Sequence, residues 1–255
     1  MKLTFLGTGT SQGIPVIACG CSTCSSPDPR DKRLRTSAYL EVENSKLVFD
    51  CGPDFRQQML NNGLDHVDAI LMTHEHNDHI IGLDDLRPMN FRQGIDMPIY
   101  GLERTLDELK LRFAYAFEKR PYPGAPRFNL FPIEALKSFS FQDIDILPLD
   151  IHHGNLPILG FKIGSLCYIT DAKTVPERSV EKIKNSKVLV INALRHRHHN
   201  THFSLDEALA FIEKVNPERA YLTHLSHLFP PYEALKNELP KNVFVAYDGL
   251  SVAIG

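Results

Sequence analysis

The chain has 255 residues, 43% of them hydrophobic and 23% charged, with a formal net charge of −3. This composition is typical of a globular protein with a large core and argues against gross non-specific binding to nucleic acid or membranes. The apolar run at Lys2–Leu6 is too short for a signal peptide, and no stretch has the roughly 18 apolar residues of a membrane span, so we expect a cytoplasmic protein that does not associate with membranes.

Short apolar runs rich in β-branched residues recur along the chain and predict strands. In chain order these runs are Lys2–Leu6, Ala38–Val42, Lys46–Phe49, Ala69–Met72, Ile144–Leu149, Leu166–Ile169, Val188–Ile191, Arg219–Leu222 and Val243–Ala246. Helical patterns are fewer and lie at Pro53–Asn61, Glu103–Phe117, Pro176–Asn185, Leu205–Val215 and Pro231–Glu238. The alternation of strands and helices toward the C-terminus indicates an α/β protein, and we expect a single domain over residues 1–255.

Three of the five cysteines, Cys19, Cys21 and Cys24, lie within six positions of one another. An odd cluster of thiols in a reducing compartment favours a metal over disulfides. Structural zinc is usually four-coordinate, so three thiolates leave one position for another ligand. Cys51 and Cys167 are poor candidates for it, since each lies in or beside a predicted strand and free cysteine commonly packs as a small hydrophobe.

The predicted strand Ala69–Met72 leads into a segment with four ligand-type side chains in six residues, His74-Glu75-His76-Asn77-Asp78-His79. Imidazole and carboxylate are ligands that suit zinc, manganese and iron. The spacing of two residues lets His74 and His76 reach one metal from an extended segment, and Asp78 and His79 then indicate a second ion nearby. A solvated polar loop is the alternative interpretation of this segment, which the spacing disfavours.

The segment Lys119–Phe131 is the least regular part of the chain, because three prolines and a glycine interrupt it. It predicts a mobile loop near a site rather than a domain linker.

Other ligand-type residues also follow predicted strands. Asp150-Ile151-His152-His153 follows Ile144–Leu149, while Asp171 and His224 follow later strands. In open α/β sheets, sites are built at the carboxyl ends of strands. We therefore expect these side chains to converge with the histidine motif, although a lone histidine after a strand is more often a structural residue.

Together these motifs resemble the metallo-β-lactamase-fold hydrolases over nearly the whole chain, from Phe5-Leu6-Gly7-Thr8-Gly9 to His224. The resemblance implies an αββα sandwich, in which two mixed β-sheets pack face to face with helices outside. It also implies three ligands for one divalent ion, three for a second ion and one bridging carboxylate. In that order these are His74, His76 and His153; Asp78, His79 and His224; and Asp171.

Two further assignments come with this resemblance. His153 is preferred to His152 as the ligand, because the following stretch Gly154–Phe161 then matches the family best. Asp50 resembles the acid that orients the histidine motif without binding metal.

Within this superfamily the chain resembles the PhnP-type phosphoribosyl 1,2-cyclic phosphodiesterases, through Cys19-x-Cys21-x-x-Cys24, His202 and His224-x-x-His227. Those proteins have a zinc-binding histidine at the position of His227, which implies a third, structural zinc held by the three cysteines and His227. The related RNase Z type transfer-RNA 3′-end endonucleases share the metal site and a histidine before a capped helix, but they lack the cysteine cluster. The alternative to this structural zinc is a loop whose three thiols bind no metal and have no redox role.

A capping box, Ser204-Leu205-Asp206-Glu207, marks a helix start two residues after His202.

Two divalent ions can generate hydroxide at neutral pH and clamp a phosphodiester. We expect Asp78 to orient that hydroxide and His202 to be the general acid for the leaving group, although His202 could also be an ordinary loop residue. Arg87 and Arg195 are weaker candidates for binding substrate phosphate, and Arg195 could equally belong to a solvated charge run.

The resulting hypothesis is a phosphodiesterase for a small cyclic, ribosyl or nucleotide-like substrate, with two zinc or manganese ions in its active site. A transfer-RNA 3′-processing endonuclease is disfavoured by the net negative charge and by the lack of a long basic arm, so nucleic acid is the less favoured partner. A non-catalytic metal-binding regulatory protein is disfavoured by the complete ligand set. Hydrolysis of a β-lactam or thioester stays open, since one fold hosts many reactions, and so does a homodimer.

Overall fold

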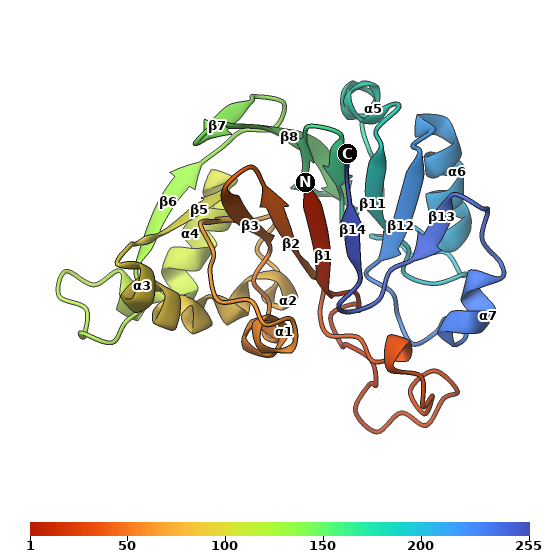
Figure 1. The fold of residues 1–255 in the computed structure, drawn as a ribbon, viewed down its shortest axis with the longest axis horizontal. Helices are drawn as coiled ribbons and strands as arrows, with labels where there is room; N and C mark the ends of the chain where they lie inside the picture. Colours follow the sequence, from red (N-terminus) through yellow and green to blue (C-terminus); the bar gives the residue numbers. More distant parts are fainter.

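The computed structural model describes all 255 residues and contains two seven-stranded sheets that pack face to face (Figure 1). The first sheet contains β1 (Lys2–Gly7), β2 (Ser37–Val42), β3 (Ser45–Phe49), β4 (Ala69–Leu71), β5 (Met97–Gly101), β6 (Phe128–Pro132) and β14 (Ser251–Ala253). The second contains β7 (Phe139–Phe141), β8 (Ile144–His153), β9 (Leu156–Ile163), β10 (Leu166–Tyr168), β11 (Val188–Asn192), β12 (Arg219–Thr223) and β13 (Val243–Val245). The strand orders are β14-β1-β2-β3-β4-β5-β6 and β13-β12-β11-β10-β9-β8-β7.

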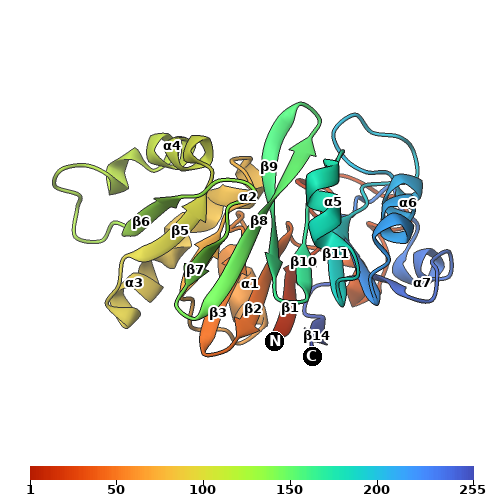
Figure 2. The same ribbon diagram turned by 90° about the horizontal axis from the view of Figure 1, so that it is seen from above.

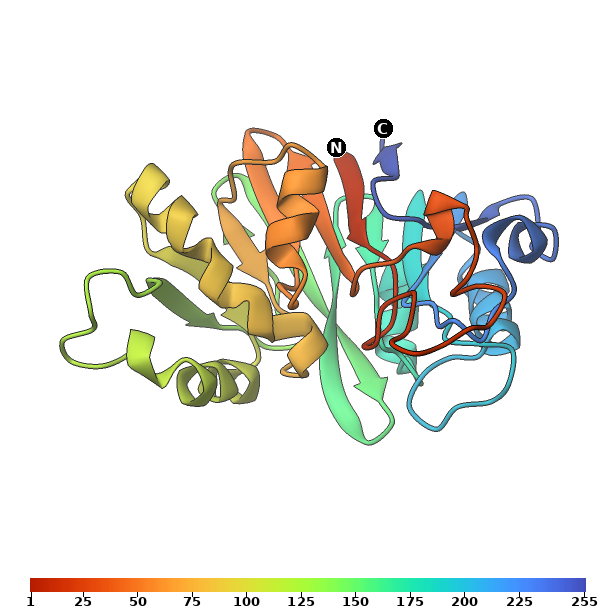
Figure 3. The same cartoon turned by 90° about the horizontal axis from the view of Figure 1, so that it is seen from below.

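Helices cover the outer face of each sheet (Figures 2 and 3). The helices over the first sheet are α1 (Phe55–Asn61), α2 (Asn77–Ile80), α3 (Arg87–Gln93) and α4 (Glu103–Arg112). Those over the second are α5 (Glu177–Ile183), α6 (Leu205–Val215) and α7 (Tyr232–Lys236). Three short 3₁₀ helices lie at Pro29–Asp31, Ile81–Leu86 and Ala114–Ala116. Both sheets mix parallel and antiparallel pairs, which confirms the predicted αββα sandwich.

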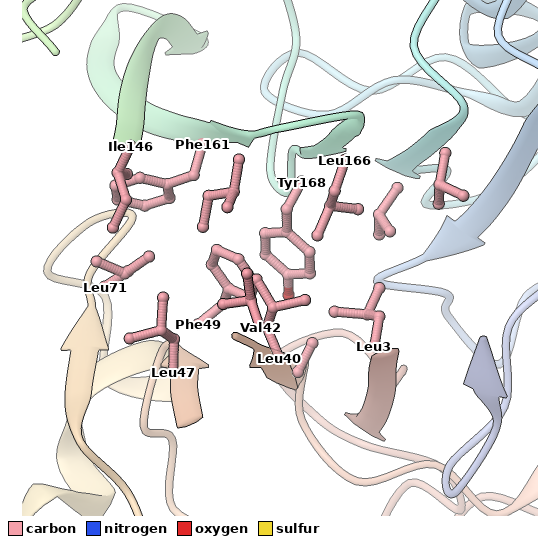
Figure 4. Close-up of a cluster of buried hydrophobic side chains, with 14 of the residues drawn as sticks. Leu3, Leu40, Val42, Leu47, Phe49, Leu71, Ile146, Phe161, Leu166 and Tyr168 are labelled. Carbon is pink, nitrogen blue, oxygen red and sulfur yellow. The ribbon is translucent and has the colours of Figure 1, made fainter. Parts of the chain in front are cut away.

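The core lies in three layers because both faces of each sheet are covered. Along β3, Leu47 and Phe49 point into the space between the sheets, whereas Val48 packs under α1 to α4. Successive side chains of a strand point to opposite faces. A strand that is buried on both faces therefore reads as a continuous apolar run, which is why these strands could be found from the sequence. Figure 4 shows the layer between the sheets, where the ring of Phe49 stacks on that of Tyr168 with centroids 4.3 Å apart.

All nine predicted strands are present, but five others were missed: β5, β6, β7, β9 and β14. β5 and β9 each contain a proline, which breaks the apolar run, and β7 and β14 have three residues each. The prediction of an irregular segment over Lys119–Phe131 was wrong for its last four residues. Phe128 to Phe131 belong to β6, which pairs in parallel with β5.

The two chain ends lie side by side, because β1 pairs with β14 and the N-terminal ammonium donates a hydrogen bond to the carbonyl of Ile254. No helix has both the length and the apolar character that crossing a membrane requires. The organisation as a single domain stays a prediction.

Replacing Phe49 by Ala should lower the free energy of unfolding by about 3–5 kcal/mol, since it removes a fully buried aromatic ring from between the sheets. Urea denaturation measures this change. Leu111→Ala is the matched control, because the Leu111 side chain is 72% exposed and its truncation should change the stability by less than about 0.5 kcal/mol. Equal losses for the two variants would contradict this account of the core.

Candidate metal centre

Asp171 lies at the centre of a buried cluster of imidazole rings at the ends of the strands. It follows β10, and its carboxylate is 2% exposed. One oxygen, Oδ1, lies 3.2 Å from His224 Nδ1 and 3.5 Å from His79 Nε2. The other, Oδ2, lies 3.9 Å from His74 Nε2. The structure therefore brings ligand-type atoms from both sheets around the carboxylate that was predicted to bridge two ions.

The three histidines predicted for one ion lie together. His74 Nε2 is 2.9 Å from His76 Nδ1, and the ring of His153 lies 5.1 Å from that of His76. His152 points away from the cluster, half-exposed, with Nε2 3.5 Å from Asp150 Oδ1. Neighbouring residues of a strand face opposite sides, so β8 can present only one of its last two histidines to the cluster. The structure selects His153.

The second predicted group also comes together. Asp78 Oδ2 lies 3.4 Å from His79 Nε2, and the rings of His79 and His224 are stacked 5.7 Å apart. Burial opposes charge on Asp78, but the adjacent imidazole of His79 holds the pKa of Asp78 below its usual value. Asp78 is therefore a carboxylate at neutral pH, as a metal ligand has to be.

Asp50 supports the histidine motif from behind. It accepts hydrogen bonds of 2.8 Å from both the backbone N–H and the hydroxyl of Thr73, and its Oδ2 lies 2.7 Å from His79 Nδ1. With Nδ1 of His79 bonded in this way, Nε2 is the atom that faces the cluster. This contact matches the orienting role predicted for Asp50, because such partners fix the ring orientation and tautomer of a ligand histidine.

Three further supporting residues were not predicted from the sequence. Thr201 offers its carbonyl, 2.8 Å away, to His153 Nδ1. Asn192, at the end of β11, accepts from the N–H of Ala172 and donates to its carbonyl, at 2.7 and 3.0 Å. Thr73 links Asp50 to His74, whose Nδ1 lies 2.9 Å from the threonine hydroxyl. The sequence could have indicated Asn192, because it is a polar residue at the end of an otherwise apolar strand.

The backbone is strained where it delivers these side chains. Asp50, Asp171 and His224 each follow a strand of the sandwich and have φ values of 59°, 59° and 56°. Residues other than glycine rarely adopt this left-handed conformation, which costs about 1–3 kcal/mol and persists at functional sites where the surroundings impose it. The double hydrogen bond from Asn192 to Ala172 is one such constraint, next to Asp171.

The cluster has the donor set of a divalent metal centre. Donor atoms within 4.8 Å of one another form overlapping groups: His74, His79 and Asp171; Asp78, His79 and His224; and His153, Asp171 and His202. His79 Nε2 and His202 Nδ1 are buried without a hydrogen-bond partner, which costs about 1–3 kcal/mol for each atom. Metal ions bound there would give these lone pairs a partner and would balance the buried carboxylates. The residues therefore fit zinc or manganese.

His202 lies inside this cluster rather than on an exposed loop. Its ring is 4.5 Å from that of His153 and 4.9 Å from that of His224, and its Nδ1 is 3.8 Å from Asp171 Oδ2. The predicted capping box is confirmed, because Ser204 and Glu207 exchange both of its hydrogen bonds. Burial lowers the pKa of His202 to about 3, so this ring is neutral at pH 7.

The three clustered cysteines lie beside His227. Cys19 Sγ is 3.2 Å and Cys21 Sγ 3.6 Å from His227 Nδ1, and Cys24 completes a group whose donor atoms lie within 4.8 Å of one another. A hydrogen bond from the backbone N–H of Cys24 lowers the pKa of Cys21 to about 6, which favours the thiolate that binds metal. All five cysteines are free, and Cys51 and Cys167 are fully buried in the core. The geometry fits the Cys₃His set, while the bound zinc stays a prediction.

Arg87 and Arg195 have hydrogen-bond partners other than the predicted metal ligands. The Arg87 guanidinium pairs with Asp84 at 2.5 Å and donates to the hydroxyl of Tyr122. It lines a cavity of about 550 Å³ between α1 and α3 that contains none of the predicted metal ligands. Arg195 donates to the carbonyls of Arg197 and His198 within its own loop. The binding of substrate phosphate by Arg87 or Arg195 stays a prediction.

The comparisons with known proteins agree with this geometry. Residues 45–225 match the family model described as a beta-lactamase superfamily domain. A crystal structure of a new diphosphatase from the PhnP family superposes with a TM-score of 0.92 at 37% identity, covering 98% of this chain and 96% of that one. This similarity confirms the resemblance that the motifs indicated.

Two sequence relatives are longer than this chain. An octanoyltransferase of Porphyromonas gingivalis is 40% identical over 256 residues, which cover all of this chain and 52% of that protein. A ribonuclease Z of Clostridium beijerinckii is 27% identical over 207 residues, which cover 76% of this chain and 62% of that one. The chain thus spans between about half and two thirds of the length of these relatives.

Zinc should protect the clustered cysteines from alkylation. We expect Cys19 and Cys21 to react with iodoacetamide in metal-free protein and to be shielded after zinc is restored, as peptide mass mapping measures. Cys24 should react slowly in both states, because it is buried and burial raises the pKa of its thiol to about 11. Cys51 and Cys167 are the internal controls and should stay unreactive until the protein is unfolded. Cys21→Ser should bind one ion fewer per chain. Equal labelling with and without zinc would contradict the Cys₃His assignment.

Proposed function

This chain belongs to the beta-lactamase superfamily, and we propose that within it the protein is a metal-dependent hydrolase of a small phosphodiester. The observation that carries the proposal is the convergence of the six other predicted ligands around Asp171, from segments of both sheets. The similarity to a diphosphatase over almost the full length of both chains supports a substrate that is attacked at phosphorus.

In this proposal His74, His76 and His153 would hold one ion, Asp78, His79 and His224 would hold the other, and Asp171 would be a ligand shared by both. Bound divalent ions would supply a nucleophilic hydroxide at neutral pH and neutralise the charge of the phosphate oxygens. The zinc held by the cysteines and His227 would brace the site without touching substrate. It would add a second connection between the N-terminal segment and the segment of His224. The first connection is made by Leu225, next to His224, which exchanges backbone hydrogen bonds with Thr8 and Thr10.

Asp78 and His202 are the residues proposed to act on the reacting groups. The Asp78 carboxylate accepts a hydrogen bond from the attacking oxygen and so aims it at phosphorus. His202 gives a proton to the leaving oxygen. Burial lowers the pKa of this imidazole to about 3, and a phosphate oxygen beside it would favour the imidazolium form that can donate the proton.

A ribosyl or nucleotide-like cyclic phosphodiester is the preferred substrate, and a diphosphate diester is the next candidate because the similar structure is that of a diphosphatase. An octanoyl transfer is not part of the proposal, since this chain spans 52% of the protein with that name. The half-buried His199 lies beside His202, with ring centroids 5.1 Å apart, and is a further polar group next to the proposed acid.

A transfer-RNA 3′-processing nuclease is the second candidate, because ribonuclease Z proteins are among the sequence relatives. Two features oppose it. The chain carries a formal net charge of −3, whereas nucleic-acid-binding domains are typically basic. The irregular segment, residues 119–127, is too short for a long basic arm. It is also attached to the body of the protein, because the hydroxyl of its Tyr122 accepts a hydrogen bond from Arg87.

The substrate class can be tested with purified protein whose metal content has been assayed. A ribosyl 1,2-cyclic phosphate, a dinucleoside diphosphate, an aryl phosphodiester and a precursor transfer RNA would be offered in parallel, with Asp171→Asn as the inactive control. We expect turnover of a small diester and none by the control. Cleavage of the precursor transfer RNA alone would support the nuclease, and metal binding without any turnover would support a regulatory protein.

Replacing His202 by Ala should preserve the metal content but slow turnover by roughly 10²–10⁴-fold, since the leaving oxygen would depart without a proton. The deficit should shrink for aryl leaving groups, which are stable as anions. Rates for matched alkyl and aryl diesters measure this difference. If both substrates are slowed equally, His202 positions the substrate and does not act as an acid. If an ion is lost, His202 is itself a ligand.

A further inference from the structure

Helix α4 is attached by side chains to both segments that carry the ligands of the first ion. One is the histidine segment, residues 74–79, and the other is the β8–β9 hairpin, whose strand β8 ends at His153. Figure 3 shows α4 on the same side of the molecule as α2 and the tip of this hairpin. The sequence motifs did not single out any residue of α4.

Arg104 makes both attachments with one guanidinium. Its Nε lies 3.2 Å from Oε1 of Glu75, as an ion pair that is not aligned as a hydrogen bond, and Glu75 lies in the sequence between the ligands His74 and His76. Its Nη2 donates a 2.7 Å hydrogen bond to the carbonyl of Pro157, which pairs with His152 in the hairpin. Because both contacts are made by one planar guanidinium, they couple the position of Glu75 to that of the hairpin backbone.

Glu75 is held firmly enough to transmit this constraint. Its side chain is 12% exposed, and Oε2 accepts a hydrogen bond of 3.0 Å from the hydroxyl of the buried Thr105. Arg112, two turns further along α4, donates to the side chain of Asn77 in the same segment. On the buried side one backbone bond, from the N–H of Leu159 to the carbonyl of Thr73, joins the two segments. Arg104 is the side-chain connection between them on the solvent side.

We propose that Arg104 is a positioning residue, which sets the spacing between the histidine segment and the β8–β9 hairpin and thereby the affinity of the first metal site. The proposal rests on the assignment of His74, His76 and His153 to one ion. Partners beyond the ligands typically change metal affinity by 10–100-fold when they are removed. Arg104 acts through Glu75 and the hairpin backbone, so we expect an effect near the lower limit of that range, about tenfold.

The test is a titration of metal-free protein with zinc in competition with a chromophoric chelator. Arg104→Met should weaken the binding of one zinc equivalent about tenfold and leave the others unchanged. Arg104→Lys, which keeps the charge beside Glu75 but lacks the planar guanidinium, should recover part of the loss. Lys110→Met is the matched control, because Lys110 lies on the same helix and pairs only with Asp107. It should bind zinc like the wild type.

The melting temperature of each metal-free variant separates positioning from a purely structural role. We expect that of Arg104→Met to stay close to that of the Lys110→Met control. A lower melting temperature with unchanged zinc affinity, or an equal loss at every equivalent, would overturn the proposal while leaving the proposed function intact. A wild-type protein that binds at most one zinc would overturn the two-ion site, and this inference with it.

Discussion

The burial of the Asp171 carboxylate is the constraint on which the rest of the site depends. A buried carboxylate is costly unless cationic or hydrogen-bonding groups surround it. Here the imidazoles of His224, His79 and His74 lie within 4 Å of its two oxygens, and these imidazoles come from both sheets. The two sheets must therefore pack with their strand ends in register for this charge to be tolerated. The layer of Phe49 and Tyr168 between the sheets maintains that packing.

Three of the ligand-type histidines are also held from outside the cluster by hydrogen-bond partners that are themselves mostly buried. The Nδ1 atoms of His74, His79 and His153 face Thr73, Asp50 and backbone carbonyls respectively. These partners direct the other ring nitrogen into the cluster, which is how outer groups tune a metal site. The strained conformations of Asp50, Asp171 and His224 belong to the same arrangement, since each turns the chain sharply after a strand.

Short-range patterns in the sequence were the reliable part of the prediction. The histidine motif, the cysteine cluster and the capping box at Ser204 were readable because residues a few positions apart are placed by local geometry alone. Strands with both faces covered were equally visible as apolar runs. The elements that were missed, such as β9 with its proline and glycine, are those in which pairing with a neighbouring strand outweighs a weak local preference.

By itself, then, the sequence determined the class of the fold, the types of ligand and the strands that carry them. The tertiary structure decided which distant groups meet. It brought His227 to cysteines 208 and 206 positions away, directed His153 and not its neighbour into the cluster, and paired Arg87 with Asp84. It also brought Arg104 between two ligand-bearing segments. The physical reason is that such contacts depend on the order and register of strands, which long-range pairing sets and which no local pattern encodes.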